Sequence, residues 1–87
     1  SFFDRRHKGR EKLVKEMLRY AFLRYSFRRL SAEVPLYVTH HVFRFTEGLG
    51  FVKEGRKRNA TKYDNQWFDV NLYGILREEL LDGNQDK

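Results

Sequence analysis

A basic segment near the start of the chain combines residue types that bind anions. Between Arg5 and Lys12, cationic side chains surround a single glycine, Gly9. A glycine lets the backbone approach a ligand closely, and the N–H groups at the start of a helix can hold a negative charge. The segment therefore predicts either an anion-binding loop or the solvated basic start of a helix.

Two adjacent histidines, His40 and His41, are the residues that could suggest a metal site. They lie in a segment with a helical pattern, where neighbouring side chains point about 100° apart. Zinc sites on helices use an i, i+4 pair instead, and the chain has no cysteine to complete a ligand set. We therefore expect no metal ion. The carboxylate of Asp69 is expected to make a surface or turn contact, and no catalytic residue is assigned.

A helix over residues 9–26 is predicted to position the basic segment. Apolar residues recur there at the spacing of one helix face, which predicts packing on a sheet; they are Leu13, Val14, Met17, Leu18, Ala21, Phe22 and Tyr25. A strand is predicted over about 28–38, because residues 28–34 alternate; Pro35 lacks an N–H donor and marks a strand end or a bulge. A second helix is predicted over 39–48, and the glycines at 48 and 50 end it.

The remaining pattern predicts a β-hairpin. A strand over 51–63 is interrupted at Gly55, and Asp64-Asn65 supplies turn residues. The partner strand runs from Trp67 to about Leu76, and Trp67 is expected in the core together with one apolar face: Phe68, Val70, Leu72 and Leu76. The order helix, strand, helix, strand, strand is an α/β (α+β) arrangement in one domain over residues 1–80, followed by a polar tail at 81–87.

Composition limits the class of protein. The 87 residues allow one small domain, and 40% hydrophobic residues argue against disorder. The net charge of +6 favours anionic partners, such as nucleic acid or a phosphate-rich cofactor. No apolar run approaches the roughly 18 residues of a membrane span, and no signal peptide is visible, so a cytoplasmic protein is expected. The start at Ser1-Phe2-Phe3 looks like the middle of a strand, which predicts a processed product or a fragment of something longer.

Four segments, taken in order, resemble the GNAT family of N-acetyltransferases. Residues 47–56, EGLGFVKEGR, are similar to the family's Glu-Lys-Leu-Gly-Phe-x-x-Glu-Gly, and residues 65–70 with 72–79 are similar to its closing hairpin strand. The loop at 6–11 is similar to Gln/Arg-x-x-Gly-x-Gly/Ala, and 18–22 to the helix after it. The resemblance covers nearly the whole chain and is nearest to the branch of ribosomal-protein, spermidine and aminoglycoside acetyltransferases.

This resemblance implies the C-terminal half of an acyl-CoA N-acyltransferase fold. In that fold, acetyl-CoA lies where a V-shaped sheet splays open between its fourth and fifth strands. Its pyrophosphate meets the start of the helix after the fourth strand. Acetyl-CoA would be the co-substrate and an amine the acceptor, and the positions implied to bind acetyl-CoA are Arg6, Lys8, Gly9, Arg10, Glu11 and Thr39.

Several positions depart from the family pattern. Glu11 stands where the loop has Gly or Ala. Thr39 and Val42 stand where the second helix has Asn and Ser, and Thr46 stands where some members have a Tyr general acid. A threonine hydroxyl is a far poorer proton donor than a phenol. Two hypotheses follow: an N-acetyltransferase domain, or a binding or structural module that keeps the fold without catalysis.

The first three strands and first two helices of the family domain have no counterpart in the chain. We therefore expect another chain or a second copy to complete the sheet, and no turnover from these 87 residues alone. A third hypothesis, a basic nucleic-acid-binding protein, rests on charge alone. We do not expect nucleic acid or a membrane as the partner.

Overall fold

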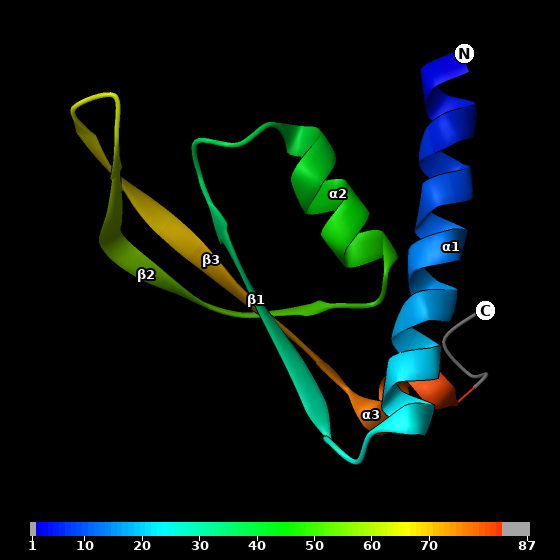
Figure 1. Ribbon diagram of the computed structural model, residues 1–87. Helices are drawn as coiled ribbons and strands as arrows, with labels where there is room; N and C mark the ends of the chain where they lie inside the picture. The colour runs from blue at the N-terminus through cyan, green and yellow to red at the C-terminus, as the bar shows by residue number, and fades with distance from the viewer. Residues whose placement is uncertain (1, 83–87) are drawn as a thin grey trace.

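Figure 1 shows the computed structural model of the chain, which describes the backbone of residues 2–82 and the side chains of residues 9–82. The first five elements follow the predicted order of helix, strand, helix, strand, strand, and a short C-terminal helix is additional. The elements are α1 (Phe2–Arg24), β1 (Arg29–Pro35), α2 (His40–Gly48), β2 (Val52–Tyr63), β3 (Gln66–Leu76) and α3 (Arg77–Leu81). The predicted tail begins inside α3, and residues 83–87 lie outside the described part.

The three strands form one antiparallel sheet in the order β1-β3-β2, so β3 lies in the middle. Asp64 and Asn65 connect β2 to β3 with φ angles of 51° and 66°. Two left-handed residues in succession are the geometry of the tight hairpin turn, and Asp and Asn tolerate it. Gly50, with φ of 105°, likewise follows the end of α2. The predicted hairpin turn at Asp64-Asn65 and the predicted end of the second helix at the glycines are therefore confirmed.

β2 carries two irregularities in its pairing with β3. The first lies between Lys53 and Gly55, where the sequence predicted an interruption, and the second between Lys57 and Thr61. At the second, Asn59 is left-handed, with φ of 46°. The Asp69 carboxylate on β3 accepts the Asn59 N–H at 2.8 Å and the Arg56 Nε–H at 2.7 Å. One carboxylate thereby holds the bulge in β2.

The helices cover the face of β3 opposite the one on which the sequence placed Phe68, Val70 and Leu72. Ile75 packs in the core with Phe22 of α1 and Leu80 of α3, and all three are almost fully buried. Tyr73, two residues before Ile75, lies on the same face and reaches α2. Trp67 is 57% exposed, so its assignment to the core is wrong. Val70, on the predicted apolar face, is buried as well, at 5% exposed, so that part of the prediction is confirmed. The burial of the opposite face follows from helix packing, which the alternation of β3 does not show.

α1 begins at Phe2, seven residues earlier than predicted, and Phe2 and Phe3 are helical where a strand was expected. A helix satisfies its backbone hydrogen bonds internally, whereas a strand needs a partner. In Figure 1 the first turns of α1 stand apart from the strands of the sheet, which pair only with one another. Although α1 has 23 residues, no helix in the range 2–82 is long and apolar enough to cross a membrane.

The apolar residues of α1 divide between two faces. The inner face turns toward the core through Leu18 and Phe22. Leu13, Met17 and Tyr25, which were predicted to belong to the same face, are instead exposed. The outer, apolar stripe of α1 consists of Leu13, Met17, Tyr20 and Leu23. The predicted spacing was correct for a helix, but it spans more than one face.

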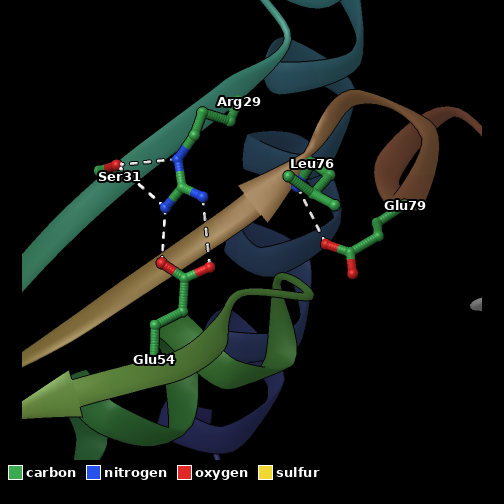
Figure 2. A network of polar contacts seen from close by, with 5 residues as sticks. All are labelled: Arg29, Ser31, Glu54, Leu76 and Glu79. Carbon is green, nitrogen blue, oxygen red and sulfur yellow. Dashed lines mark hydrogen bonds and ion pairs between the residues drawn. The ribbon is translucent and has the colours of Figure 1, made fainter.

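A network of polar contacts crosses the sheet on the face opposite Tyr73 (Figure 2). The Arg29 guanidinium of β1 donates to both Glu54 oxygens of β2, at 2.5 and 3.3 Å, and to the Ser31 hydroxyl. It passes over Gly74 of β3, where an added Cβ would collide with both the arginine and the carboxylate. The strands are thus linked across the central strand through a glycine.

Arg77 joins the end of α1 to the end of β3. Its Nη1 donates to the carbonyl oxygens of Phe22, Tyr25 and Phe27, while its backbone N–H bonds the Arg28 carbonyl at 2.8 Å. The last carbonyls of a helix have no partner within the helix. The guanidinium therefore supplies a partner to the Phe22 carbonyl of α1 and, through the Tyr25 and Phe27 carbonyls, holds the turn that leads into β1.

Replacing Arg77 with alanine should destabilise the fold by about 2 kcal/mol, because the partly buried Phe22 carbonyl and the exposed Tyr25 carbonyl lose charge-assisted hydrogen bonds. The stability of Arg77→Lys should lie between those of the native chain and Arg77→Ala, since one ammonium cannot reach all three carbonyls. Urea unfolding followed by far-UV circular dichroism measures the change. Arg44→Ala, on an exposed face of α2, is the matched control and should change stability little. Equal stability of the Arg77 and Arg44 variants would contradict this role.

The contacts of Asp69 predict a pH dependence of stability. The Asn59 N–H and the Arg56 guanidinium lower the pKa of Asp69 in the folded chain. Its stabilising contribution is complete above the unfolded pKa of about 3.9 and is lost as pH falls through the lower folded pKa. The stability difference between Asp69→Asn and the native chain should therefore shrink below about pH 4. Arg56→Gln should raise the Asp69 pKa only part of the way to its ordinary value, because the Asn59 N–H still lowers it. An NMR titration that gives Asp69 of the native chain an ordinary or raised pKa would refute the assignment.

Candidate functional site

A small groove of about 220 Å³ lies between α1 and α2, and we name it the α1–α2 groove. Its lining residues are Arg10, His41, Val42 and Phe45. Arg10 is one of the residues predicted to bind acetyl-CoA, and Val42 stands where the family's second helix has Ser. The fold thus brings a predicted cationic residue and the second-helix position together across one groove.

The other predicted residues are placed differently. The backbone at Gly9 is open, with no atom within 4 Å of the place where a Cβ would stand. Thr39 lies on the opposite side of α2, so the structure does not bring it to Arg10. The backbone of Arg6 and Lys8 belongs to α1, while their side chains lie outside the described part.

Glu11 faces the C-terminal end of α2. Its carboxylate lies so close to Gly48 that a Cβ there would collide with it. Gly48 therefore permits the close approach of the two helices, in addition to its place at a helix end. A negative charge at a helix C-terminus is electrostatically unfavourable. Among the side chains of residues 9–82, no cationic group lies within salt-bridge distance of the Glu11 carboxylate.

The start of α1 does not provide the predicted pyrophosphate cradle in this conformation. In an α-helix that begins at Phe2, the N–H groups of Gly9 and Glu11 bond carbonyls four residues earlier. Only the first four N–H groups of a helix are free to hold an anion. The expected helix start near Gly9 is therefore corrected: Arg10 reaches the groove as a side chain, but the neighbouring backbone donors are engaged.

A larger open groove of about 640 Å³ lies on the other side of α2, and we name it the α2–sheet groove. One wall is α2, and the others come from the segment after β1 and from β2 and β3. The lining residues are Leu36, Val38, Thr39, His40, Phe43, Glu47, Lys53, Asn71 and Tyr73. No motif in the sequence indicated this groove, because its residues come from four separate segments.

Tyr73 and Glu47 form a hydrogen-bonded pair in this groove. The Tyr73 phenol donates to a Glu47 oxygen at 3.0 Å, and only 2% of Tyr73 is exposed. Burial raises the pKa of Tyr73, and the hydrogen bond and charge of Glu47 raise it further. Tyr73 is therefore held as a neutral phenol whose O–H donates a hydrogen bond to the Glu47 carboxylate.

Asn71 is the buried polar residue that sequence reasoning did not select. It is 7% exposed, and its Oδ1 has no hydrogen-bond partner among the described residues. The alternation of β3 places Asn71 on the same face as Tyr73, which is the one signal that could have indicated its burial. Most buried polar side-chain atoms in proteins have a partner, so this oxygen needs one.

His40 and His41 lie on different sides of α2, in the α2–sheet groove and the α1–α2 groove respectively. Their divergence follows from the helical rotation of about 100° per residue. Among the described side chains, no group of three or more potential metal ligands gathers at one place. The two histidines therefore serve two separate surfaces.

Solved acetyltransferase structures share this fold. A dodecameric spermidine N-acetyltransferase SpeG from Vibrio cholerae matches 83% of this chain with a TM-score of 0.73 and 22% identity, and a point mutant of that enzyme matches 85% with a TM-score of 0.76 and 22% identity. A GNAT-family acetyltransferase from Bacillus anthracis matches 79% with a TM-score of 0.67 and 26% identity. The chain spans 42%, 43% and 41% of their respective lengths.

The sequence itself carries the family signal. Residues 2–72 match the acetyltransferase (GNAT) domain, whereas no curated protein matches the chain significantly. The matched range includes the α1–α2 groove, the lining of the α2–sheet groove except Tyr73, and all elements from α1 to most of β3. The C-terminal half of the acyl-CoA N-acyltransferase fold, predicted from the sequence, agrees with the structural matches. The chain therefore belongs to the GNAT acetyltransferase domain family.

Proposed function

We propose that the chain is the acetyl-CoA-holding part of an N-acetyltransferase that transfers an acetyl group to an amine. Family membership supports the reaction class, and the chain spans less than half of the acetyltransferases that it matches. The observation that carries the proposal is the position of Arg10 beside Val42 and Phe45 in the α1–α2 groove. A cation beside an apolar wall suits a phosphate-bearing ligand with an apolar arm.

Binding of the pyrophosphate requires a change at the start of α1. Gly9 lies inside the helix, and an interior glycine costs about 1 kcal/mol relative to alanine. The helix is therefore weakest at the residue where the family motif has its loop. We propose that acetyl-CoA draws residues 2–8 out of the helix, so that the freed N–H groups near Gly9 to Glu11 and the side chains of Arg6, Lys8 and Arg10 meet the phosphates.

The reaction forms a C–N bond and breaks a C–S bond. A neutral amine attacks the thioester carbonyl, the thiolate of CoA departs, and the amine loses a proton while the thiolate takes one up. Thr46, at the family's general-acid position, donates its hydroxyl to the Val42 carbonyl at 2.8 Å. Its proton is thus engaged within α2, and we assign the transfer to no side chain of this chain.

A module without catalysis is the second candidate function. The continuous α1 and the contact of Glu11 with Gly48 favour it, because both occupy elements that the family uses for the cofactor. This hypothesis predicts that native α1 stays helical and that acetyl-CoA does not bind. The two candidates therefore differ in one measurable property, the affinity of the native chain for CoA.

Calorimetric titration with CoA should show saturable binding to the native chain, and Arg10→Ala should weaken it at least tenfold by removing a charged phosphate contact. Arg58→Ala, on the hairpin, is the matched control for loss of one positive charge. Glu11→Gln should strengthen binding by removing a negative charge near the groove. Glu11→Gly should do the same, but glycine also lowers the stability of the helix. Helical chemical shifts of residues 2–8 should disappear when CoA is added.

Absence of binding in the native chain and in both Glu11 variants would support the module without catalysis. Saturable binding that is equally strong in Arg10→Ala and Arg58→Ala would place the cofactor elsewhere. These outcomes concern binding alone, because we expect no turnover from the 87 residues by themselves.

We further propose that another chain or a second copy completes the domain. At the two ends of β1, the Arg28 carbonyl and the Leu36 N–H bond the strand that contains β3. Because hydrogen-bonded positions alternate along an antiparallel pair, the backbone groups of Leu30, Ala32 and Val34 also point toward β3. The backbone groups of Ser31 and Glu33 therefore point to an edge that is unpaired among the described strands. The outer apolar stripe of α1 is also exposed. An open sheet edge beside exposed apolar residues is prone to association.

Light scattering across a concentration series should show association of the native chain, and Met17→Glu with Leu23→Glu should reduce it by placing charges in the stripe. Lys12→Glu is a control for charge alone, outside the stripe. A native chain that stays monomeric at high concentration, with no partner present, would contradict the proposal.

A further inference from the structure

We propose that the outer end of the β2–β3 hairpin binds single-stranded nucleic acid, with Arg58 and Lys62 meeting phosphates and Trp67 stacking on a base. The sequence offered charge alone for such a partner, and on that ground none was expected. The structure adds a surface on which cations and an exposed ring lie together. The proposal does not depend on acetyl-CoA binding or on acetyl transfer.

The hairpin extends beyond the rest of the sheet. β1 pairs with β3 from Val70 to Leu76, so among the described strands residues 61–63 and 66–68 pair with each other alone. In Figure 1 the turn of this two-stranded ribbon stands away from both α1 and α2. The end of the hairpin is therefore open to a partner, and the contacts around it decide which of its faces is free.

One face of the ribbon is covered by an aromatic side chain. Tyr37, from the segment after β1, stacks on Tyr63 with ring centroids 4.4 Å apart and meets the edge of Phe68 at 5.6 Å. Lys62 and Trp67 stand opposite each other in the register, so both point to the other face. Trp67 is 57% exposed there. Because a two-stranded ribbon is marginally stable alone, the Tyr37 stack supports it and leaves the Trp67 face to a partner.

The charges on the face opposite Trp67 cancel. Lys57 of β2 pairs with Glu33 of β1 at 3.4 Å, and Arg29 of β1 pairs with Glu54 of β2. Each of these two pairs joins one cation to one carboxylate. This face of the sheet therefore offers a polyanion little attraction.

On the Trp67 face, by contrast, the cations are in excess. The Lys62 ammonium lies 5.7 Å from the centroid of the Trp67 ring. Arg58 lines an open hollow together with Asp69, whose carboxylate already bonds the Arg56 guanidinium. Among the side chains of residues 9–82, neither Arg58 nor Lys62 has an ion-pair partner. Their charges are therefore left for an anion.

The neighbouring cation and ring match the parts of a nucleotide. Each nucleotide joins a phosphate to a planar base, and proteins bind single strands through cationic side chains and aromatic rings on which bases stack. An acidic peptide is the principal alternative, since its carboxylates would also meet Arg58 and Lys62. It has no base to stack on Trp67, and in a duplex the bases are stacked on one another. The exposed indole therefore favours a single strand.

The test is a fluorescence titration of the native chain with oligothymidylate of about 12 nucleotides. Trp67 is the one tryptophan of the sequence, so its fluorescence reports on this surface directly. We expect saturable quenching that weakens about sevenfold when salt rises from about 50 to about 200 mM, as two phosphate contacts predict. Polyglutamate tests the acidic peptide, a DNA duplex of equal length tests the double strand, and CoA is added as a competitor.

Variants separate the contacts, with binding followed by the anisotropy of a labelled oligothymidylate. Lys62→Gln should weaken binding about threefold and reduce the salt slope by about 0.7, because one phosphate contact is lost. Lys57→Gln removes the same charge from the ion-paired face and should leave the slope unchanged. Trp67→Leu should weaken binding at least fivefold by removing the stacking ring, and Trp67→Phe should restore part of the loss. Circular dichroism should show a native fold for each variant, because all three positions are exposed.

Several results would overturn the proposal. Oligothymidylate that causes no saturable quenching leaves the hairpin without this ligand. Polyglutamate that binds as tightly would assign the surface to an acidic peptide, and tighter binding of the duplex would assign it to double-stranded DNA. Displacement of the oligonucleotide by CoA would show that the two share one site. If Trp67→Leu failed to fold, equal effects of Lys62→Gln and Lys57→Gln would still show general charge attraction in place of this surface.

Discussion

The arrangement of this domain depends on β3 being hydrogen-bonded along both of its edges. Because β1 and β2 satisfy its backbone groups, β3 can be buried and can carry the packing partners of α1 and α2. Ile75 meets Phe22 of α1, and Tyr73 meets Glu47 of α2. α3 continues directly from β3, and Arg77 at that junction holds the end of α1. Loosening β3 would therefore release both helices together.

The nine residues of α2 separate two grooves of different chemistry. Its helical period turns Val42 and Phe45 toward α1, beside the Arg10 guanidinium. The same period turns Phe43 and Glu47 toward the sheet, where the acceptors gather. One short helix thereby gives a cationic, apolar groove on one side and an acceptor-rich groove on the other.

α1 brings together two demands on the same residues. As a continuous helix from Phe2, it satisfies its N–H groups internally, and Arg77 bonds the Phe22 carbonyl near its end. The family's use of this region for a pyrophosphate requires some of the same N–H groups to face a ligand. Gly9 is the residue at which these demands meet, because it weakens the helix and leaves the backbone open to solvent. In the proposed function, the balance between hydrogen bonds inside the helix and hydrogen bonds to acetyl-CoA would decide whether these N–H groups are free.

The sequence by itself determined the features that depend on neighbours along the chain. The element order, the end of β1 at Pro35, the end of α2 before Gly50 and the turn at Asp64 follow from local backbone preferences. The family signal and the inclusion of Arg10 in a candidate site were also available from the sequence.

Only the tertiary structure decided which faces are buried and which residues meet. A periodic pattern shows that a helix or strand has an apolar face, but it does not show what lies opposite. For this reason Met17 and Trp67 are exposed, although the pattern placed both in the core. Thr39 and Arg10 lie on different sides of α2, and Asn71 is buried without a partner for its oxygen, because segments distant in sequence set these positions. Burial and hydrogen-bond satisfaction are properties of the packed chain, and no local pattern contains them.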